Sequence, residues 1–180
     1  MRYALDIETT GLDPMIDRVA SIAFVPIGDA EGALDVMIRP DGWTMPAAAS
    51  AVNGLDDLTL LVNGESIGMA IGKMFELLED ATEVWAHNAK FDVAFLRAEA
   101  ERCGYSDPFE GIEIRCTGLE TRNMMGLADA FRSDGSPRIA KLSAVIERIS
   151  GPQDVKYHNA WDDAECVAFI AEWLDPVCEL

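Results

Sequence analysis

Three strand-like segments with short links occupy the first 39 residues, and this arrangement restricts the possible folds more than any other feature of the chain. Residues 2–8 alternate between apolar side chains and smaller or acidic ones, which is the period of a strand. Two further segments, 18–27 and 34–39, are rich in β-branched and other apolar residues and are separated by turn residues. Three consecutive strands with such short connections predict an antiparallel meander.

The rest of the chain combines helical patterns with isolated strands. Residues 40–65 are irregular, with Pro46 and several glycines, and leave room only for short helices. Ser136 and Pro137 are typical of a helix start, and Gly151 is typical of a helix end. We expect helices at 66–80, 90–103, 117–131, 136–151 and 160–174, and strands at 83–87 and 112–117. This order predicts an α/β fold, a mixed five-stranded sheet of an antiparallel meander plus parallel strands, flanked by helices.

The size and composition of the chain are those of one domain, which we expect to span residues 1–180. No apolar run approaches the length of a membrane span, and the N-terminus reaches Asp6 too soon for a signal peptide. The four cysteines show no Cys-x-x-Cys spacing, so we expect reduced, mostly buried thiols in a cytoplasmic protein.

Asp6 and Glu8 are two residues apart on the first predicted strand, so both side chains leave the same face. Two crowded carboxylates repel each other unless a cation lies between them, and Mg²⁺ and Mn²⁺ prefer carboxylate oxygens. Alone, this spacing is more typical of solvated acids on an edge strand. The sequence Thr9-Thr10-Gly11 that follows, at a strand end where backbone can approach a ligand, favours a metal site.

Two more polar motifs lie at the ends of later elements. His87 and Asn88 follow a predicted strand, and Asp92 lies in the first turn of the next helix. These residues have a structural alternative, in which Asp92 interacts with the helix dipole and the other two satisfy loop backbone. His158 and Asp163 stand where the chain enters its last helix. Both histidines of the chain therefore fall in the candidate motifs.

Together, the three motifs resemble those of the DEDDh (DnaQ-like) 3′–5′ exonuclease family of the ribonuclease H-like superfamily. The matching segments are Asp6 to Leu12, Ala86 to Leu96, and His158 to Asp163. The last segment has the His-x₄-Asp spacing of the histidine branch, because Asn159 stands where the other branch has tyrosine. The resemblance extends from Tyr3 to Leu174 and implies the ribonuclease H-like fold.

The resemblance implies a catalytic set of Asp6, Glu8, Asp92, His158 and Asp163. The four acids would hold two divalent metal ions, Mg²⁺ or Mn²⁺, and the histidine would act as general base. The implied activity is hydrolysis at the 3′ end of single-stranded DNA or RNA, with release of nucleoside 5′-monophosphates. Contacts to the terminal nucleotides are implied for Thr10, Gly11, Leu12, His87 and Asn88.

The sequence departs from the family pattern at a few positions. Asn53 stands where many relatives carry histidine, and we interpret it as peripheral to the metal centre. Asp162 precedes Asp163 and competes with it as the ligand, although the spacing favours Asp163. Trp161 is bulkier than the leucine common nearby, and we expect it to pack on the core.

The acidity of the chain restricts its partners. With 32 acidic and 14 basic residues the net charge is −18, which is unlike a protein that holds long duplexes on a basic face. Three explanations remain open: a short or single-stranded substrate gripped at its end, a partner that supplies affinity, or no binding of nucleic acid. A homodimer and a polymerase or repair complex are both compatible with the family.

Two other classes of function compete with the nuclease. A catalytically silent binding or regulatory module would keep the fold but normally loses at least one metal ligand, whereas all five catalytic candidates are present here. An acidic mimic of nucleic acid would explain the charge, but it would not need two histidines placed within the motifs.

Overall fold

The structure is a computed structural model that describes residues 1–152 and 158–178. Its strands are β1 (Arg2–Thr9), β2 (Val19–Pro26), β3 (Leu34–Met37), β4 (Glu83–Ala86) and β5 (Glu113–Cys116). Its helices are α1 (Ala47–Asn53), α2 (Asp57–Asn63), α3 (Ile67–Leu78), α4 (Ala89–Arg102), α5 (Thr117–Glu120), α6 (Leu142–Ser150) and α7 (Ala160–Cys178). The predicted strands, and the α/β class that follows from their order, are confirmed.

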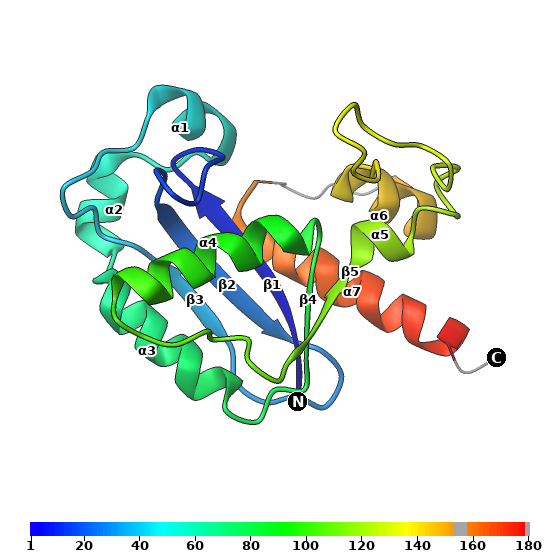
Figure 1. Ribbon diagram of the computed structural model, residues 1–180, viewed down its shortest axis with the longest axis horizontal. Coiled ribbons are helices and arrows are strands. Elements are labelled where there is room, and N and C mark those ends of the chain that lie inside the picture. The colour runs from blue at the N-terminus through cyan, green and yellow to red at the C-terminus, as the bar shows by residue number, and fades with distance from the viewer. Residues whose placement is uncertain (153–157, 179–180) are drawn as a thin grey trace.

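The strands form one mixed sheet in the order β3-β2-β1-β4-β5 (Figure 1). β1 lies antiparallel to β2 and parallel to β4, and β4 lies parallel to β5. Pairing between β1 and β4 stops at Leu5, opposite Ala86, whereas β1 stays paired with β2 as far as Thr9. The last residues of β1 therefore project past the end of β4, and backbone groups there are available to other elements.

The two faces of the sheet are covered by different helices (Figure 1). Tyr3, Leu5 and Ile7 of β1 belong to the core that includes residues of α3 and α4. Ala4 belongs to a second core, which is built largely from α7 together with α6 and Trp85. Because side chains alternate along a strand, the residues of β1 that follow Ala4 at even positions also face α7.

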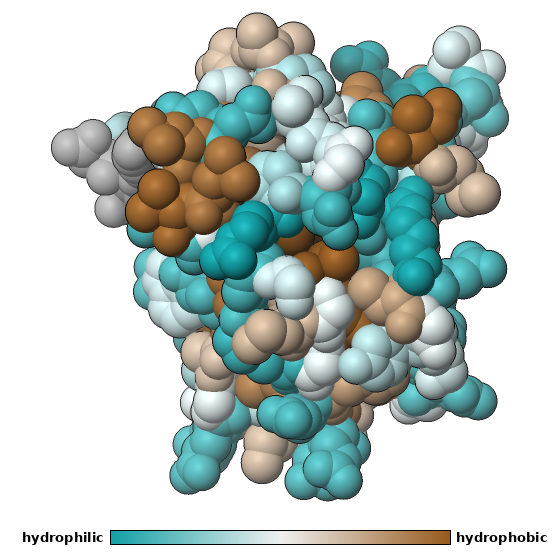
Figure 2. All heavy atoms as spheres, turned by 90° about the vertical axis from the view of Figure 1, so that its left-hand side faces the viewer, coloured by the Kyte–Doolittle hydropathy of each residue, from teal (hydrophilic) through white to brown (hydrophobic). Residues whose placement is uncertain are grey.

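The helices α1 and α2 form a small outer layer near the end of β1, over Ala20, Met45 and Leu60. Figure 2 views the side of the molecule on which α1, α2 and α3 lie, and it shows apolar residues gathered in patches on the upper half. The exposed apolar residues of α1 and α2 are Val52, Leu58, Leu61 and Val62. Leu60 faces inward and is fully buried, so α2 carries apolar residues on more than one face.

The predicted helix at 117–131 is wrong for most of its length. Only α5 is helical, and turns follow it to residue 129. Gly126 has a φ of 68°, which interrupts a right-handed helix. The guanidinium of Arg122 donates hydrogen bonds to the carbonyl oxygens of Leu127, Ala128 and Ala130 and organises a compact loop instead.

The predicted helix start at Ser136-Pro137 is also wrong, since α6 begins at Leu142. The backbone N–H and the hydroxyl of Ser136 both donate to the carboxylate of Asp134, which makes a turn rather than a helix cap. Pro137 pairs with Phe131 in an isolated β-bridge. The predicted end at Gly151 is confirmed, where the residue is the C-cap at a φ of 80°.

The cysteines whose side chains the structure describes are free thiols. Cys166 is buried, and burial together with nearby carboxylates raises its pKa to about 11. Cys103 and Cys116 are half-buried, so the prediction of mostly buried thiols holds fully for Cys166 alone among them. In the described part of the chain, helices combining the length and apolar character needed to traverse a bilayer are absent.

Candidate active site

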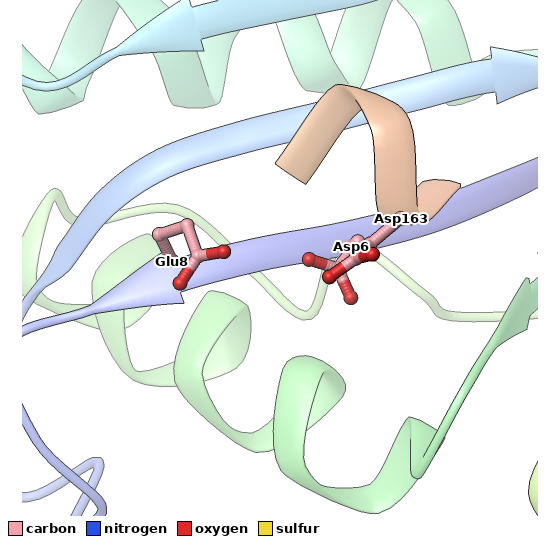
Figure 3. Close-up of side chains that lie close together, drawn as sticks. All are labelled: Asp6, Glu8 and Asp163. Atoms are coloured by element: carbon pink, nitrogen blue, oxygen red, sulfur yellow. The ribbon is translucent and has the colours of Figure 1, made fainter. Parts of the chain in front are cut away.

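Asp6 and Glu8 lie on β1, on the face that α7 covers, as the alternation of the strand requires. Asp163 approaches them from the first turn of α7 (Figure 3). One carboxylate oxygen from each of the three residues lies within 4.8 Å of the others. Asp6 and Asp163 are placed together in the close-up, and Glu8 lies one step further along the strand. The structure thus joins the first and third motifs, which are more than 150 residues apart in the sequence.

Asp163 is held by the chain that precedes α7. Its Oδ2 accepts a hydrogen bond of 3.1 Å from the backbone N–H of His158, whereas its Oδ1 is buried without a hydrogen-bond partner in the structure. Among the described residues, the cluster of carboxylate oxygens contains Asp163 and not Asp162. The geometry therefore agrees with the spacing, which favours Asp163 over Asp162 as the ligand.

Asp92 reaches the same site from α4 on the other side of the sheet. It is only 3% exposed, and its carboxylate accepts hydrogen bonds from the backbone of Ile7 and from its own N–H. The group at Ile7 is available because β4 stops pairing with β1 at Leu5. Asp92 is not within the three-residue cluster, but its charge raises the pKa of Asp6. The four predicted acids therefore form one electrostatic unit.

The four carboxyl groups share one response to burial. Desolvation is the largest cause that raises the pKa of each of Asp6, Glu8, Asp92 and Asp163. The pKa of Glu8 rises from 4.5 to about 7, through burial first and the charge of Asp163 second. Repulsion from Asp92, Asp163 and Glu8 adds to the raised pKa of Asp6. Without a cation, burial therefore opposes the ionisation of all four groups.

The residues present fit a divalent metal ion. Mg²⁺ and Mn²⁺ take carboxylate oxygens, and the cluster of Asp6, Glu8 and Asp163 supplies three of them. The buried and unpartnered Oδ1 of Asp163 lacks the partner that buried polar atoms normally have. A bound cation would provide that partner and would also relieve the repulsion that raises the four pKa values.

His158 lies beside Asp163 at the entrance to α7. Its side chain is exposed, and its φ of 71° is one of two positive values among the non-glycine residues that the structure describes. Histidine in this conformation is uncommon, and such backbone geometry often occurs at functional sites. The interaction with His158 lowers the pKa of Asp163 and partly offsets its burial. This electrostatic interaction relates the exposed imidazole to Asp163, and the role of His158 as general base stays a prediction.

The loop after β1 combines a rigid base with an exposed apolar side chain. Thr10 is buried, and its hydroxyl accepts from the N–H of Arg18 at 2.9 Å. A Cβ on Gly11 would collide with the carboxylate of Asp17, which folds beneath the loop and accepts from the N–H of Asp13. Leu12 is 84% exposed at the loop surface. The need for glycine at position 11 therefore comes from Asp17 in this structure.

His87 is tied into the protein by both ring nitrogens. Its Nδ1 lies 3.0 Å from Oγ1 of Thr117, and its Nε2 lies 2.9 Å from the carbonyl oxygen of Ala140. Burial lowers the pKa of His87, so the neutral ring is favoured. Asn88 is exposed at a φ of 73° in the tight turn from β4 to α4. This geometry matches the structural alternative for His87, and substrate contacts by either residue stay predictions.

Asn53 is a residue of the site that the sequence interpretation placed outside it. It ends α1, its amide donates at 3.5 Å to the carbonyl oxygen of Thr9, and its hydrogen bond to Glu8 lowers the pKa of that acid. Its Oδ1 accepts from the N–H of Leu55 at 3.0 Å, which fixes the amide orientation. The interpretation as peripheral is therefore wrong. The only sequence signal was its position, where many relatives of the resembled family carry histidine.

Comparison with known proteins identifies relatives of the whole chain. Residues 3–170 match the protein family described as Exonuclease. The chain is 30% identical over 167 residues to the PolC-type DNA polymerase III of Thermotoga maritima, which covers 91% of this chain and 11% of that protein. It is 30% identical over 122 residues to ribonuclease T of Pectobacterium atrosepticum, covering 58% of this chain and 55% of that protein.

The fold has counterparts among solved structures. Exonuclease I of E. coli in complex with a dT13 oligonucleotide superimposes with a TM-score of 0.80 at 18% sequence identity. The match covers 97% of this chain and 40% of exonuclease I. A zinc-bound form of the complex of exonuclease I with single-stranded DNA gives the same TM-score at 17% identity. The predicted ribonuclease H-like fold is therefore confirmed.

The mixed sheet brings acids of the first and third motifs together, and Asp92 of the second motif interacts electrostatically with Asp6. The chain belongs to the Exonuclease family, in its DnaQ-like DEDDh group. The family resemblance inferred from the three motifs is thus confirmed. The chain spans about a tenth of the PolC-type relatives and about half of ribonuclease T.

Proposed function

We propose that the chain is a metal-dependent 3′–5′ exonuclease that removes nucleoside 5′-monophosphates from single-stranded DNA or RNA. The observation that carries the proposal is the cluster of Asp6, Glu8 and Asp163, in which one buried carboxylate oxygen has no partner. Asp92 joins the cluster electrostatically from the opposite face of the sheet. Structural neighbours that bind oligonucleotides, and relatives named as ribonuclease and DNA polymerase, support a nucleic-acid substrate.

The four acids would hold two divalent ions, Mg²⁺ or Mn²⁺, because Asp6 clusters with Glu8 and Asp163 and interacts electrostatically with Asp92. When bound, such ions supply positive charge that stabilises the attacking and leaving oxygens of an in-line displacement. A bound cation also explains how an acidic chain tolerates a phosphate at this position.

The proton transfer in this proposal belongs to His158. Its exposed imidazole takes a proton from the attacking water as the water oxygen bonds to phosphorus. The bond between phosphorus and the 3′ oxygen of the preceding nucleotide breaks, that oxygen takes up a proton from solvent to become a 3′ hydroxyl, and the nucleoside 5′-monophosphate leaves. The backbone hydrogen bond from His158 to Asp163 fixes the histidine relative to the acids.

The terminal nucleotide would lie against the loop after β1. Leu12 offers an exposed apolar surface to the last base, and the loop beneath it is braced by Thr10 and Asp17. Asn88 is exposed at the start of α4, where it is free to approach the preceding nucleotide. His87 acts through the loop that it anchors, since both of its ring nitrogens already have partners.

We extend the proposal to the setting of the enzyme. One catalytic domain, residues 1–180, would act in the cytoplasm. Polymerase III chains and subunits among the relatives support a polymerase or repair complex as its partner rather than a homodimer. A partner of this kind would also supply affinity that a chain of net charge −18 lacks.

Digestion of end-labelled oligonucleotides tests the proposal. We expect stepwise loss from a free 3′ end with Mn²⁺ or Mg²⁺, on DNA and RNA, and no cleavage of 3′-blocked substrate or with EDTA. Asp163→Asn should lower activity by more than about 100-fold, since changing a residue that only hydrogen-bonds to a metal ligand already lowers metal affinity or activity by about 10–100-fold. Asp162→Asn is the matched control and should stay active, because Asp162 is not one of the three clustered carboxylates.

His158→Ala should cost about 10²–10⁴-fold in kcat, which is the usual contribution of general base catalysis. Intact substrates in every condition with metal would overturn the proposal and favour a silent binding module. Cleavage of a 3′-blocked, 5′-free oligonucleotide would overturn the direction alone.

A further inference from the structure

The positive charge of this acidic chain is concentrated in one segment. Residues 115–148 contain six basic and four acidic residues, whereas the rest of the chain contains 8 basic and 28 acidic residues. This basic segment includes α5, the loop organised by Arg122, and α6. Figure 1 shows it as a separate projection at the upper right of the sheet, near the start of α4.

The basic segment is anchored at the end of β4. His87, which follows β4, contacts the hydroxyl of Thr117 through Nδ1 and the carbonyl oxygen of Ala140 through Nε2. Ile139 packs so closely on Gly118 that a Cβ there would meet its side chain at 3.0 Å. The loop before α6 is therefore held in a defined position relative to α4.

A small cleft lies between the basic segment and the start of α4. It has a volume of about 120 Å³ and is lined by Asn88, Lys90, Leu119, Arg132, Pro137 and Ile139, among others. Lys90 and Arg132 come from different elements and are both exposed. Lys90 and Asp92 both lie in the first turn of α4, where Lys90 is exposed and Asp92 is buried. The cleft therefore lies at the end of α4 that carries one of the proposed catalytic acids.

Neither cation of the cleft is used by the fold. Among the described residues, Lys90 and Arg132 make no side-chain hydrogen bond or ion pair, whereas most other cations do, such as Lys73 with Glu65 and Arg97 with Asp107. Arg132 contributes a minor part of the lowered pKa of Asp134, which comes mainly from Ser136. Two unpaired cations that line one cleft indicate an anionic ligand.

We propose that this cleft binds the phosphates on the 5′ side of the scissile bond, an inference that rests on the proposed exonuclease function. Lys90 and Arg132 neutralise those phosphates, and Leu119 and Ile139 contact the sugars or bases between them. Phe131 is 58% exposed next to Arg132, and the guanidinium of Arg122 lies over its ring at 5.2 Å from the centroid, so a base of the single strand would stack on the opposite face. The grip is local, which reconciles a nucleic-acid substrate with a net charge of −18.

The test compares two double variants of equal charge. Lys90→Gln/Arg132→Gln removes the cations of the cleft, and Arg39→Gln/Lys73→Gln removes two exposed cations near β3, at the opposite edge of the sheet. Hydrolysis of dT2 and dT12 by the full chain is measured with Mn²⁺ at several salt concentrations. The charge-keeping variant Lys90→Arg/Arg132→Lys controls for loss of folding.

We expect the cleft variant to raise KM for dT12 about tenfold more than for dT2, with the slope of log KM against log salt reduced by about 1.4. That figure is about 0.7 for each of two phosphates on a single strand. The β3-edge variant should leave both quantities as in the parent, and the charge-keeping variant should restore them. Equal losses on dT2 and dT12, or an unchanged salt slope, would overturn the inference. A parent protein that cleaves neither oligonucleotide would instead overturn the proposed function.

Discussion

Removal of divalent ions should make this protein less stable as the pH rises, which is opposite to the usual behaviour of carboxylates. In the folded chain burial raises the pKa of Glu8 from 4.5 to about 7. Between these values the folded state keeps a proton that the unfolded state has released. The folded protein then binds more protons, so its free energy of unfolding falls as the pH rises.

The magnitude follows from the difference between the two pKa values. One pKa unit corresponds to about 1.4 kcal/mol, so ionised Glu8 costs the metal-free fold about 3 kcal/mol once the pH exceeds 7. Asp6, Asp92 and Asp163 act in the same direction, because their pKa values are also raised. His87 acts in the opposite direction below pH 6.5, since its pKa is lowered and unfolding there binds a proton.

Urea unfolding of EDTA-treated protein at pH 6 and pH 8 measures this effect. Glu8→Gln should be more stable than the parent at pH 8 and should show a smaller loss between the two values. Glu101→Gln, an exposed acid on α4, is the matched control and should behave as the parent does. A metal-free parent that is as stable at pH 8 as at pH 6, with Glu8→Gln no different, would refute the reasoning.

Three further substitutions test the supports of the site. Glu99→Ala should lower the free energy of unfolding in urea by about 3–5 kcal/mol, because it leaves Arg18 and the N–H of Val19 without their buried partner. Glu101→Ala is the control and should change this free energy little. Gly64→Ala should be destabilising by about 1–3 kcal/mol, since the new Cβ would strike the carbonyl oxygen of Leu60 and the backbone of Arg39, whereas Gly68→Ala in α3 meets no atom and should be neutral or stabilising in thermal melts. Asn53→Ala should raise the Mn²⁺ concentration for half-maximal activity about tenfold, because it removes a hydrogen bond to the metal ligand Glu8. Asn63→Ala is the control. A metal titration of Asn53→Ala equal to that of Asn63→Ala would contradict the contact to Glu8.

Local signals predicted most of the fold. The alternation in residues 2–8 corresponds to β1, and the helices expected at 90–103 and 160–174 correspond to α4 and to most of α7. The segment 117–141 was missed because long-range partners decide it: Arg122 takes backbone carbonyls as far away as Arg138, and Asp134 uses the hydroxyl that a helix cap would need. A propensity for helix was therefore overridden by side-chain hydrogen bonds that no spacing reveals.

The candidate site likewise contains parts that the sequence predicted and parts that it did not. The grouping of the four acids was predictable from the family motifs, with strand alternation placing Asp6 and Glu8 on one face, and the structure brings the acids together. The catalytic roles of these acids and of His158 stay predictions. The supports of these residues were not predictable. The contact of Asn53 with Glu8 depends on how α1 packs near the end of β1. The space that Asp17 fills beneath Gly11 depends on how the loop between these two residues folds.

The excess of acids links metal binding, stability and substrate grip in one equilibrium. A ligand that binds only the folded state stabilises it by about 2.7 kcal/mol at a concentration one hundred times its Kd. This is close to the ~3 kcal/mol that ionised Glu8 costs the metal-free fold at pH 8. A divalent ion at about one hundred times its Kd would therefore restore the stability that burial of ionised Glu8 removes. The metal-free site is thus destabilised by its own carboxylates. We expect tight binding of substrate only when a cation and a phosphate are both present, with Lys90 and Arg132 contacting the strand beside the site.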